Sequence, residues 1–294
     1  MSIQLNNLSK RFPNGKGLFD VTFEVEKGEV FGYLGPNGAG KSTTIRHLVG
    51  FMKPTNGSSK INNLDCWKQS AEIQKYIGYL PGEIAFIEGL NGLETLKLLG
   101  DMRDMKDVSR RNQLIERFQF DVKTPIKKMS KGMKQKVGIV AAFMHDPEIL
   151  ILDEPTSGLD PLMQNEFIQL ILEEKARGKT ILMSSHLFEE IERTCDTVAI
   201  IKDGYLVTVE DIQQIQTDQQ KQFNIKVKSH EDIALLKQSE LNISSIDHFN
   251  VTIEVQGNYE ELVQLLSQCG ITNIDMTRQN LEDMFMNYYD RRGQ

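Results

Sequence analysis

The sequence predicts an α/β fold built on a mostly parallel sheet. Apolar runs that fit buried strands recur along the chain, at Glu29–Leu34, Ile149–Leu152, Thr180–Met183 and Val198–Ile201. Helical segments separate these runs, and such alternation is typical of parallel sheets with helices on their faces. The length of 294 residues allows one large domain of this kind and a smaller second one.

The N-terminal segment predicts a different kind of sheet. Ile3–Leu8 and Val21–Val25 have alternating or β-rich patterns, with a turn signal at Pro13–Gly15 between them. These patterns indicate an N-terminal antiparallel β subdomain. Residues from about 69 to 145 look mainly helical, with a strand signal only at Tyr76–Leu80. We therefore expect a helical subdomain over about residues 83–145.

The composition changes at Asp211–Gln222, a Gln-rich stretch that suits a linker or an exposed helix. Beyond it the patterns predict, in order, a strand, a helix, a hairpin turning at His248–Asn250, a helix, a strand and a closing helix, at Phe223–Val227, Asp232–Leu236, Ser245–Val255, Tyr259–Leu266, Ile271–Met276 and Leu281–Tyr289. This order is compatible with a split βαβ, ferredoxin-like α+β domain. We therefore divide the chain into residues 1–215 and an accessory domain of residues 216–294.

Bulk composition limits the class of protein. The net charge of −7, without a basic arm or tail, does not favour binding of nucleic acid. Apolar runs such as Val137–Met144 are far shorter than the roughly 20 residues of a membrane-spanning helix, and no signal pattern opens the chain. Cys66, Cys195 and Cys269 lie far apart, as expected of reduced thiols in a cytosolic protein. We expect any membrane role to come through a partner.

A glycine-rich stretch after the strand Glu29–Leu34 carries the strongest motif. It matches G-x-x-x-x-G-K-[ST] at every fixed position and leads into a helix that ends near Gly50. Backbone N–H groups of such a loop surround phosphate oxygens, and the helix start adds its positive dipole end. A plain Gly-rich turn before a helix is the alternative. We predict that Lys41 reaches the β- and γ-phosphates, that Ser42 binds Mg²⁺, and that the nucleotide site comprises Gly35, Pro36, Asn37, Gly38, Ala39, Gly40, Lys41, Ser42 and Thr43.

The strand Ile149–Leu152 ends in two acids, Asp153 and Glu154. Its four apolar residues fit a strand buried on both faces, and ligands bind at the carboxyl ends of such strands. We expect Asp153 to hold Mg²⁺, directly or through water, and Glu154 to polarise the water that attacks the γ-phosphate. His186 follows the strand Thr180–Met183 at the same end and could contact the γ-phosphate. Two exposed acids at a strand end are the alternative, which the phosphate loop disfavours.

A second anion site is predicted at the start of the helix that follows Ser130. Ser130 is a good N-cap, and apolar residues from Met133 to Met144 follow helical spacing. Five lysines crowd this helix start, where the macrodipole disfavours cations: Lys127, Lys128, Lys131, Lys134 and Lys136. Such a conflict suggests that an anion binds there. Since Lys41 already serves the chain's own phosphates, we expect this helix to face a nucleotide held by another copy; a solvated lysine-rich face is the alternative.

Together these residues resemble the ATPase domain of an ATP-binding cassette (ABC) transporter, a P-loop NTPase, across roughly residues 1–215. In this resemblance Gly35–Ser42 is the Walker A loop, and Ile149–Glu154 is the Walker B strand with the catalytic glutamate. Ser157–Asp160 resembles the D-loop, and His186 the switch histidine. The resemblance thus implies an enzyme that binds ATP and Mg²⁺ and hydrolyses ATP, with Lys41, Glu154 and His186 as catalytic residues.

Two further stretches extend the resemblance. The sequence from Ser130 is similar to the family signature, usually LSGGQ; it keeps Gly132 but has other residues in place of the usual Leu, first Gly and Gln, namely Met129, Lys131 and Met133. Phe12 matches the aromatic residue that stacks on adenine. The resemblance implies that two ATPase subunits close head-to-tail on two ATP molecules, and that contacts to ATP include Ser130, Gly132 and Asp160.

One departure from the family concerns the segment after the strand near Ile77–Pro81. The family usually has a glutamine there, whereas this chain has Gly82 and then Glu83. Either Glu83 takes over the link to Mg²⁺ and water, or that contact is weakened. By resemblance, Gly82–Gly92 would lie near the groove that receives a coupling helix of the permease.

The resemblance implies the ATPase subunit of a bacterial exporter, held at the cytoplasmic face of the membrane by a separate permease. The region after residue 215, which ends in Asn280–Tyr289, resembles the C-terminal extension of bacterial exporter ATPases that handle drugs, antibiotics, peptides or lipids. A soluble ABC ATPase that acts on nucleic acid, or an ATP-dependent regulatory subunit, is the alternative. A single cassette, no zinc spacing and the acidic balance disfavour the nucleic-acid alternative. The cargo, and the choice between homodimer and heterodimer, stay open.

Overall fold

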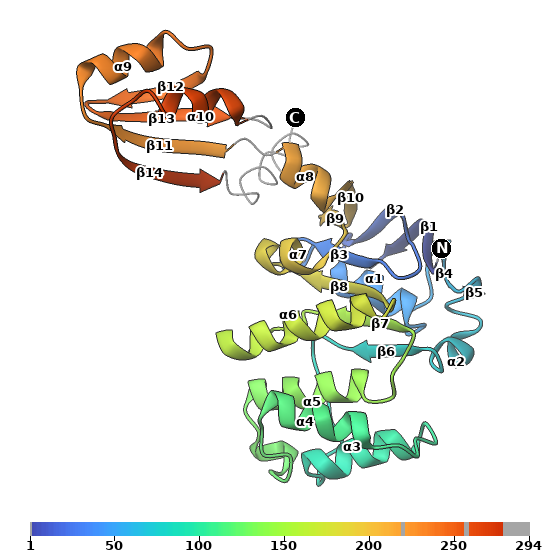
Figure 1. Ribbon diagram of the computed structural model, residues 1–294. Coiled ribbons are helices and arrows are strands. Elements are labelled where there is room, and N and C mark those ends of the chain that lie inside the picture. Colours follow the sequence, from blue (N-terminus) through green and yellow to red (C-terminus); the bar gives the residue numbers. More distant parts are fainter. Residues whose placement is uncertain (1, 219–220, 256–258, 279–294) are drawn as a thin grey trace. The chain divides into compact units, whose positions relative to one another are not determined.

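A computed structural model describes residues 2–218, 221–255 and 259–278 (Figure 1). The chain forms two compact units, of which the first ends at Glu210 and the second begins at Asp211. Each unit has a hydrophobic core of its own, and the two are described separately. Within the described ranges, no helix combines the length and the apolar character that crossing a membrane requires.

The N-terminal strands of the first unit form the expected antiparallel region. β1 (Ile3–Arg11) pairs with β2 (Gly17–Val25) on one side. On its other side β1 pairs with β4 (Asn56–Ile61), which in turn pairs with β5 (Leu64–Asp65). The sequence did not predict β4 and β5, because the stretch NGSSKI of β4 is mostly polar and gives no strand signal. Pairing with β1 supplies the backbone hydrogen bonds that form this strand.

The predicted parallel strands are neighbours in the same sheet. Their order is β9 (Thr197–Lys202), β3 (Val30–Leu34), β8 (Thr180–Ser185), β7 (Ile149–Asp153) and β6 (Ile77–Leu80). An unpredicted strand, β10 (Tyr205–Asp211), pairs in parallel with β2 and joins both parts into one mixed ten-stranded sheet. The carboxyl ends of the parallel strands therefore meet at one edge, where ligands bind in such sheets.

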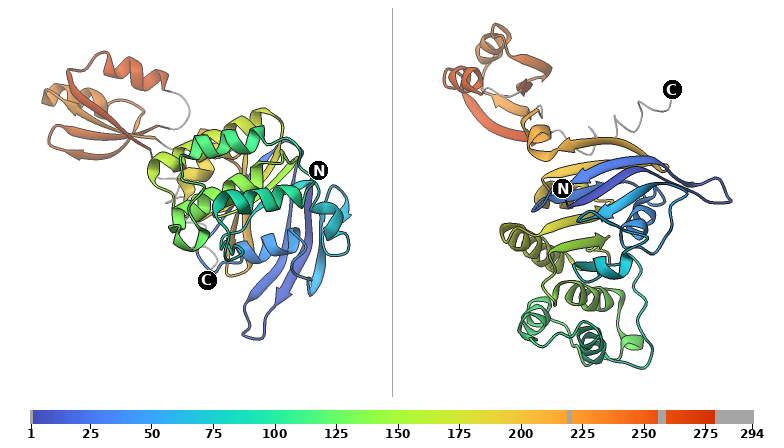
Figure 2. Two further views of the ribbon diagram at one scale, coloured as in Figure 1. Left: turned by 90° about the horizontal axis from the view of Figure 1, so that it is seen from below. Right: turned by 90° about the vertical axis from the view of Figure 1, so that its right-hand side faces the viewer.

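Helices connect the parallel strands, as the sequence predicts. The middle of the chain forms a helical region in which α5 (Lys131–Phe143) contacts α3 (Gly92–Asp101), α4 (Ser109–Phe118) and the strand β6 (Figures 1 and 2). The other helices of the first unit are α1 (Lys41–Leu48), α2 (Ser70–Ile73), α6 (Pro161–Ala176), α7 (Phe188–Thr194) and the 3₁₀ turn Ile126–Lys128.

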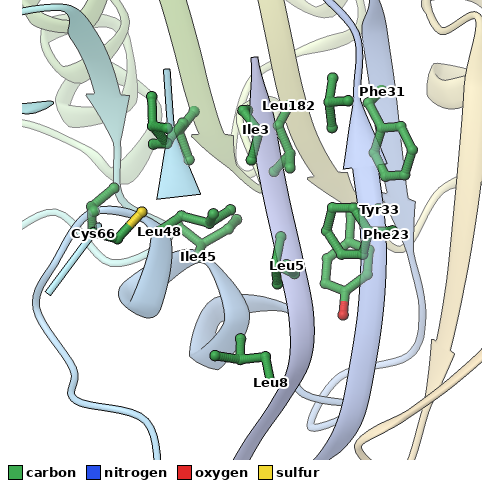
Figure 3. Packing of buried hydrophobic residues seen from close by; sticks show 14 of the residues in the cluster. Ile3, Leu5, Leu8, Phe23, Phe31, Tyr33, Ile45, Leu48, Cys66 and Leu182 are labelled. Atoms are coloured by element: carbon green, nitrogen blue, oxygen red, sulfur yellow. The ribbon is translucent and has the colours of Figure 1, made fainter. Parts of the chain in front are cut away.

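The core of the first unit fixes the position of α1. Ile45 and Leu48 of α1 lie among buried side chains of the sheet, which include Leu5, Phe23 and Tyr33 (Figure 3). Burial of each such side chain contributes about 1.5–3 kcal/mol. The Tyr33 hydroxyl lies 3.1 Å from Oγ1 of Thr44 in α1, and burial raises the pKa of Tyr33. The start of α1 is therefore anchored to the sheet by packing and by a buried hydrogen bond.

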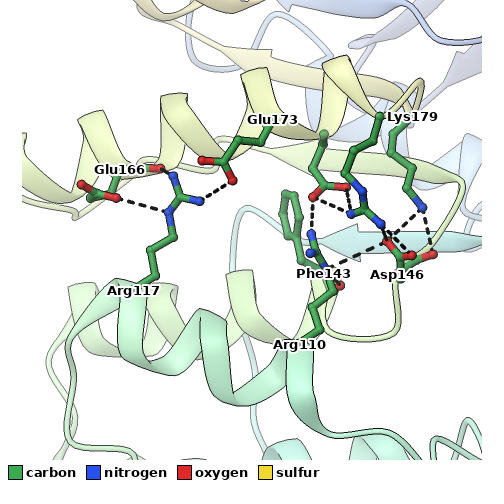
Figure 4. Close-up of polar contacts among 9 residues, drawn as sticks. Arg110, Arg117, Phe143, Asp146, Glu166, Glu173 and Lys179 are labelled. Carbon is green, nitrogen blue, oxygen red and sulfur yellow. Dashed lines mark hydrogen bonds and ion pairs between the residues drawn. The ribbon is translucent and has the colours of Figure 1, made fainter.

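Ion pairs join the helical region to the rest of the first unit (Figure 4). Arg117 of α4 bonds two acids of α6: its Nη1 lies 2.7 Å from Oε2 of Glu173, and its Nε lies 3.2 Å from Oε2 of Glu166. Arg110 of α4 donates to Glu174 of α6, which also pairs with Arg177 at 3.0 Å. The orientation of α4 on α6 thus rests on charged side chains.

The second unit is a small α+β domain. After α8 (Ile212–Asp218), it has the expected element order, with β11 (Lys221–Val227), α9 (His230–Lys237), β12 (Asn242–Asp247), β13 (Asn250–Val255), α10 (Glu260–Leu266) and β14 (Ile271–Arg278). The four strands form an antiparallel sheet in the order β12-β13-β11-β14. This order confirms the split βαβ topology. The helix expected at Leu281–Tyr289 lies outside the described residues.

Candidate functional site

The glycine-rich loop connects β3 to α1 at the carboxyl edge of the parallel strands. Its glycines are required by close neighbours. A Cβ at Gly35 would lie 2.4 Å from the carbonyl oxygen of Ile201, and a Cβ at Gly40 would lie 2.6 Å from Cδ2 of Leu18. Gly40 also has φ of 117°, a backbone conformation that other residues rarely adopt. The loop is therefore held in one shape, with the first N–H groups of α1 available to an anion.

Lys41 lies over this loop. Its side chain is only 5% exposed, and its ammonium donates to the carbonyl oxygens of Gly35 at 2.6 Å and Pro36 at 3.2 Å. The same ammonium lies 3.0 Å from Oε1 of Glu154. A buried cation at the start of a helix is a site where phosphate oxygens bind favourably.

Asp153 is buried at the end of β7, beside the loop. Its Oδ1 accepts a hydrogen bond of 2.6 Å from the Ser184 hydroxyl at the end of β8. A Cβ at Gly82 would lie 3.1 Å from the other carboxylate oxygen of Asp153, so this residue leaves room for the acid. Ser184 fixes the acid in place, although no sequence motif includes this residue.

Glu154 and His186 meet in the structure, as their positions at the ends of neighbouring strands suggest. Nδ1 of His186 lies 2.5 Å from Oε2 of Glu154. The backbone of Glu154 has φ of 50°. Its N–H donates to two oxygens of Ser184, the hydroxyl at 3.0 Å and the carbonyl at 3.2 Å. A non-glycine residue in this region is strained and is typically held by its surroundings at functional sites.

The groove formed by these elements has a volume of about 440 Å³. Its lining contains most of the predicted phosphate loop, the strand-end residues and Glu83, and it comprises Asn37, Gly38, Gly40, Lys41, Ser42, Thr43, Gly82, Glu83, Lys131, Glu154, Ser157 and His186. Gly35, Pro36, Ala39 and Asp153 are not among its lining residues.

The start of α5 confirms the predicted N-cap, because the Ser130 hydroxyl accepts a hydrogen bond of 3.2 Å from the Met133 N–H. Lys131 donates to the Ser157 hydroxyl at 2.8 Å and lines the same groove as Lys41. Lys131 of α5 therefore borders the chain's own groove, whereas Ser130 does not line it; that the start of α5 faces a nucleotide held by another copy stays a prediction.

The remaining predicted residues lie outside the groove lining. Phe12 is half-buried in the turn between β1 and β2. Gly132 packs against Gly158, whose carbonyl oxygen would lie 2.6 Å from a Cβ at Gly132. Asp160 is the N-cap of α6, where its Oδ1 accepts from the Met163 N–H at 3.0 Å. Phe12, Gly132 and Asp160 therefore do not contribute to the lining of the groove.

A buried glutamine, which the sequence analysis missed, connects α5 to this site. Nε2 of Gln135 donates to the carbonyl oxygen of Pro155 at 2.7 Å, and its side chain is almost fully buried. No sequence pattern marks this buried polar residue, because Gln135 falls outside the apolar stripe that contains Val137, Val140 and Met144. Such a residue usually has a hydrogen-bond partner that only the fold reveals.

Comparisons with known proteins agree with this geometry. The family described as ABC transporter matches residues 18–157. An uncharacterized ABC transporter ATP-binding protein, YhcH of Bacillus subtilis, is 31% identical over 97% of this chain and 94% of its own length. The bacitracin transport ATP-binding protein BcrA of Bacillus licheniformis is 33% identical over 97% and 96%. The linearmycin resistance ATP-binding protein LnrL of Bacillus subtilis is 28% identical over 98% of each.

Solved structures show the same fold. An ATP-binding subunit of an ABC transporter is 33% identical, with a TM-score of 0.68 over 74% of this chain and 92% of that one. A cassette solved as a dimer with ADP and phosphate after hydrolysis has a TM-score of 0.66 over 71% of this chain and 98% of that one, at 24% identity. The chain therefore belongs to the family of ABC transporter ATP-binding proteins, and it is an ATP-binding ATPase subunit of such a transporter.

Proposed function

We propose that this chain energises an exporter whose permease is a separate protein, and that it acts as a homodimer at the cytoplasmic face of the membrane. Two relatives that match almost the whole chain are named for bacitracin transport and linearmycin resistance, which supports an export role. Residues 1–215 would form the ATPase domain and residues 216–294 an accessory domain. Glu83 and the segment up to Gly92 would lie near the docking site of the permease.

The observation that carries the catalytic proposal is the position of the Glu154 carboxylate. One oxygen lies 3.0 Å from the Lys41 ammonium and the other 2.5 Å from Nδ1 of His186. Lys41 would hold the β- and γ-phosphates, so Glu154 would stand beside the γ-phosphate and act as the base that orients the attacking water. His186 would orient Glu154 and contact the same phosphate.

Oxygen donors at the groove fit Mg²⁺. The Ser42 hydroxyl and the Asp153 carboxylate are the hard ligands that this ion prefers, and it commonly takes only one or two carboxylates together with phosphates and water. In the part of the chain that the structure describes, no three His, Cys, Asp or Glu side chains form a metal cluster. Mg²⁺ would neutralise charge on the β- and γ-phosphates. Glu83 lines the groove and would reach the ion through water.

A second copy would complete the site. Ser130 is exposed at the start of α5, and Asp160 is exposed at the start of α6. We propose that these residues, with Gly132, approach the ATP held by the partner subunit. Phe12, half-buried beyond the end of β1, would stack on adenine. Closure of two such grooves would drive the permease, and hydrolysis would reopen them.

The test uses the full chain with Glu154→Gln, and Glu148→Gln as the matched control. Glu148 is an exposed acid that directly precedes the first residue of β7. We expect Glu154→Gln to bind ATP, to lose about 100-fold or more in turnover, and to double its mass from 33.5 kDa on a sizing column with ATP. Near wild-type turnover of Glu154→Gln would overturn the catalytic proposal. If the full chain does not co-purify with any membrane permease, the proposal that it energises a separate permease is overturned.

A further inference from the structure

Glu190 is a buried acid close to the site that none of the motifs includes. It lies in the first turn of α7 and is 6% exposed. Its Oε1 accepts a hydrogen bond from the Thr156 hydroxyl, and its Oε2 accepts one of 2.8 Å from the Ser185 hydroxyl. Both carboxylate oxygens are therefore occupied by side chains from two other segments.

These two segments carry the reacting groups of the proposed site. Thr156 follows Glu154 by two residues, and Ser185 directly precedes His186. Since His186 and Glu154 also bond each other at 2.5 Å, the contacts form a closed ring that runs through both backbones and through Glu190. Displacement of either segment would change the distance between the imidazole and the carboxylate.

The surroundings fix Glu190 itself. The Thr194 hydroxyl bonds the carbonyl oxygen of Glu190 at 2.6 Å one turn later in α7. Ser185 in turn accepts the Leu187 N–H at 2.9 Å, which shapes the loop that carries His186. A buried carboxylate costs free energy unless it is hydrogen-bonded, and here charge-assisted bonds to two hydroxyls satisfy it.

The strained backbone of Glu154 also has to be held by contacts of neighbouring residues. Glu154 has φ of 50°, a conformation that costs about 1–3 kcal/mol and persists only where neighbouring contacts enforce it. The bond from Thr156 to Glu190 restrains the chain directly after Glu154, and Ser184 restrains its N–H. Both sides of the strained residue are thus held.

We propose that Glu190 is a positioning residue for ATP hydrolysis. Through its bonds to Thr156 and Ser185, it keeps the Glu154 carboxylate and the His186 imidazole at hydrogen-bonding distance from each other. The inference rests on the proposed catalytic role of Glu154. Glu190 is not among the residues that line the groove, and its carboxylate bonds the hydroxyls of Thr156 and Ser185. It therefore affects the rate of the chemical step and not the binding of ATP.

The principal test compares Glu190→Ala with Glu189→Ala in the full chain. Glu189 is the adjacent residue on the same helix, but its side chain is 82% exposed. We expect Glu190→Ala to lower kcat by about 10- to 100-fold, because small displacements of reacting groups have effects of this size. The KM for ATP should change by less than about threefold, and Glu189→Ala should match the wild type in both constants.

Two conservative variants separate positioning from folding. Glu190→Gln keeps the length of the side chain and can bond both hydroxyls, so it should recover kcat to within about fivefold of wild type. Thr156→Val removes one hydroxyl with little change of shape, and combining it with Glu190→Ala should lower kcat no further than Glu190→Ala alone. If Glu190→Ala does not fold, these single variants carry the test, with Thr156→Val expected to lose kcat at unchanged KM.

Three results would overturn the inference: wild-type kcat in Glu190→Ala, a raised KM at unchanged kcat, or independent additive losses in the double variant. Glu154→Gln is assayed in parallel. If it keeps full turnover, the proposed function itself fails. If it is inactive while Glu190→Ala equals wild type, only the positioning role of Glu190 fails.

Discussion

The ion pairs between α4 and α6 yield a quantitative prediction about stability. Glu173 and Glu174 are adjacent in α6, and each pairs with an arginine of α4 (Figure 4). The side chain of Glu174 is 3% exposed, whereas that of Glu173 is 59% exposed. Replacement of each by alanine therefore compares a buried acid with an exposed acid in nearly the same position.

The burial of the partners sets the expected magnitudes. Breaking a fully buried pair costs about 3–5 kcal/mol, because a buried charge is left without its partner. The arginines that Glu174 bonds are 25% and 41% exposed, for Arg110 and Arg177, and Arg110 keeps the carbonyl oxygen of Phe143 at 3.3 Å. We therefore expect a lower value, about 2–3 kcal/mol, for Glu174→Ala. An exposed pair is worth about 1 kcal/mol or less, which we expect for Glu173→Ala.

Urea unfolding of the full chain measures this difference. The single tryptophan, Trp67, lies between β5 and α2, so its fluorescence reports on the first unit. The midpoint should fall clearly further for Glu174→Ala than for Glu173→Ala, at an unchanged slope. Equal midpoints for the two variants would refute the reasoning that burial decides the value of these ion pairs.

Three further predictions concern single positions. Gly82→Ala would push a Cβ to within 3.1 Å of the Asp153 carboxylate, so we expect the Mg²⁺ concentration for half-maximal ATPase activity to rise several-fold, and an unchanged Mg²⁺ titration would contradict this. Burial, with the nearby charge of Arg103, lowers the pKa of His145 from 6.5 to about 4. Between pH 4 and pH 6.5 the unfolded chain therefore binds more protons than the folded chain. The free energy of unfolding should fall as the pH drops from 6.5 to 4. His145→Gln should remove part of that pH dependence in urea unfolding, and identical pH profiles would argue against this cause. Asn91 forms a capping box with Glu94 at the start of α3, so Asn91→Ala should cost about 1 kcal/mol of unfolding free energy, and a change within error would exclude the cap as a stabilising contact.

The fold could be predicted where the sequence pattern matched the environment. β7 and β8 are buried along their whole length, and their apolar runs predicted them directly. β4 was missed because its polar residues carry no strand pattern, and the strand forms only by pairing with β1. β10 was also not predicted, although Tyr205–Val209 is rich in β-forming residues; its burial is only partial and a single residue pair joins it to β2.

The site could be predicted where the chemistry is local in sequence. The phosphate loop and the pair Asp153–Glu154 are contiguous motifs, so their spacing alone gives their position. Ser184 and Glu190 bond side chains that lie 31 and 34 residues away in the sequence, and no sequence spacing marks such a contact. Both residues are buried polar groups with hydrogen-bond partners, and burial of this kind can be recognised only in the folded chain.

The pair formed by Lys41 and Glu154 has a consequence for how a polyphosphate is received. Two opposite charges 3.0 Å apart largely cancel each other's field at the centre of the groove. Under the proposed function, phosphate oxygens that approach Lys41 would compete with the Glu154 carboxylate for one ammonium. Their binding would release this carboxylate beside the phosphate, so that binding of the nucleotide would itself expose the proposed base.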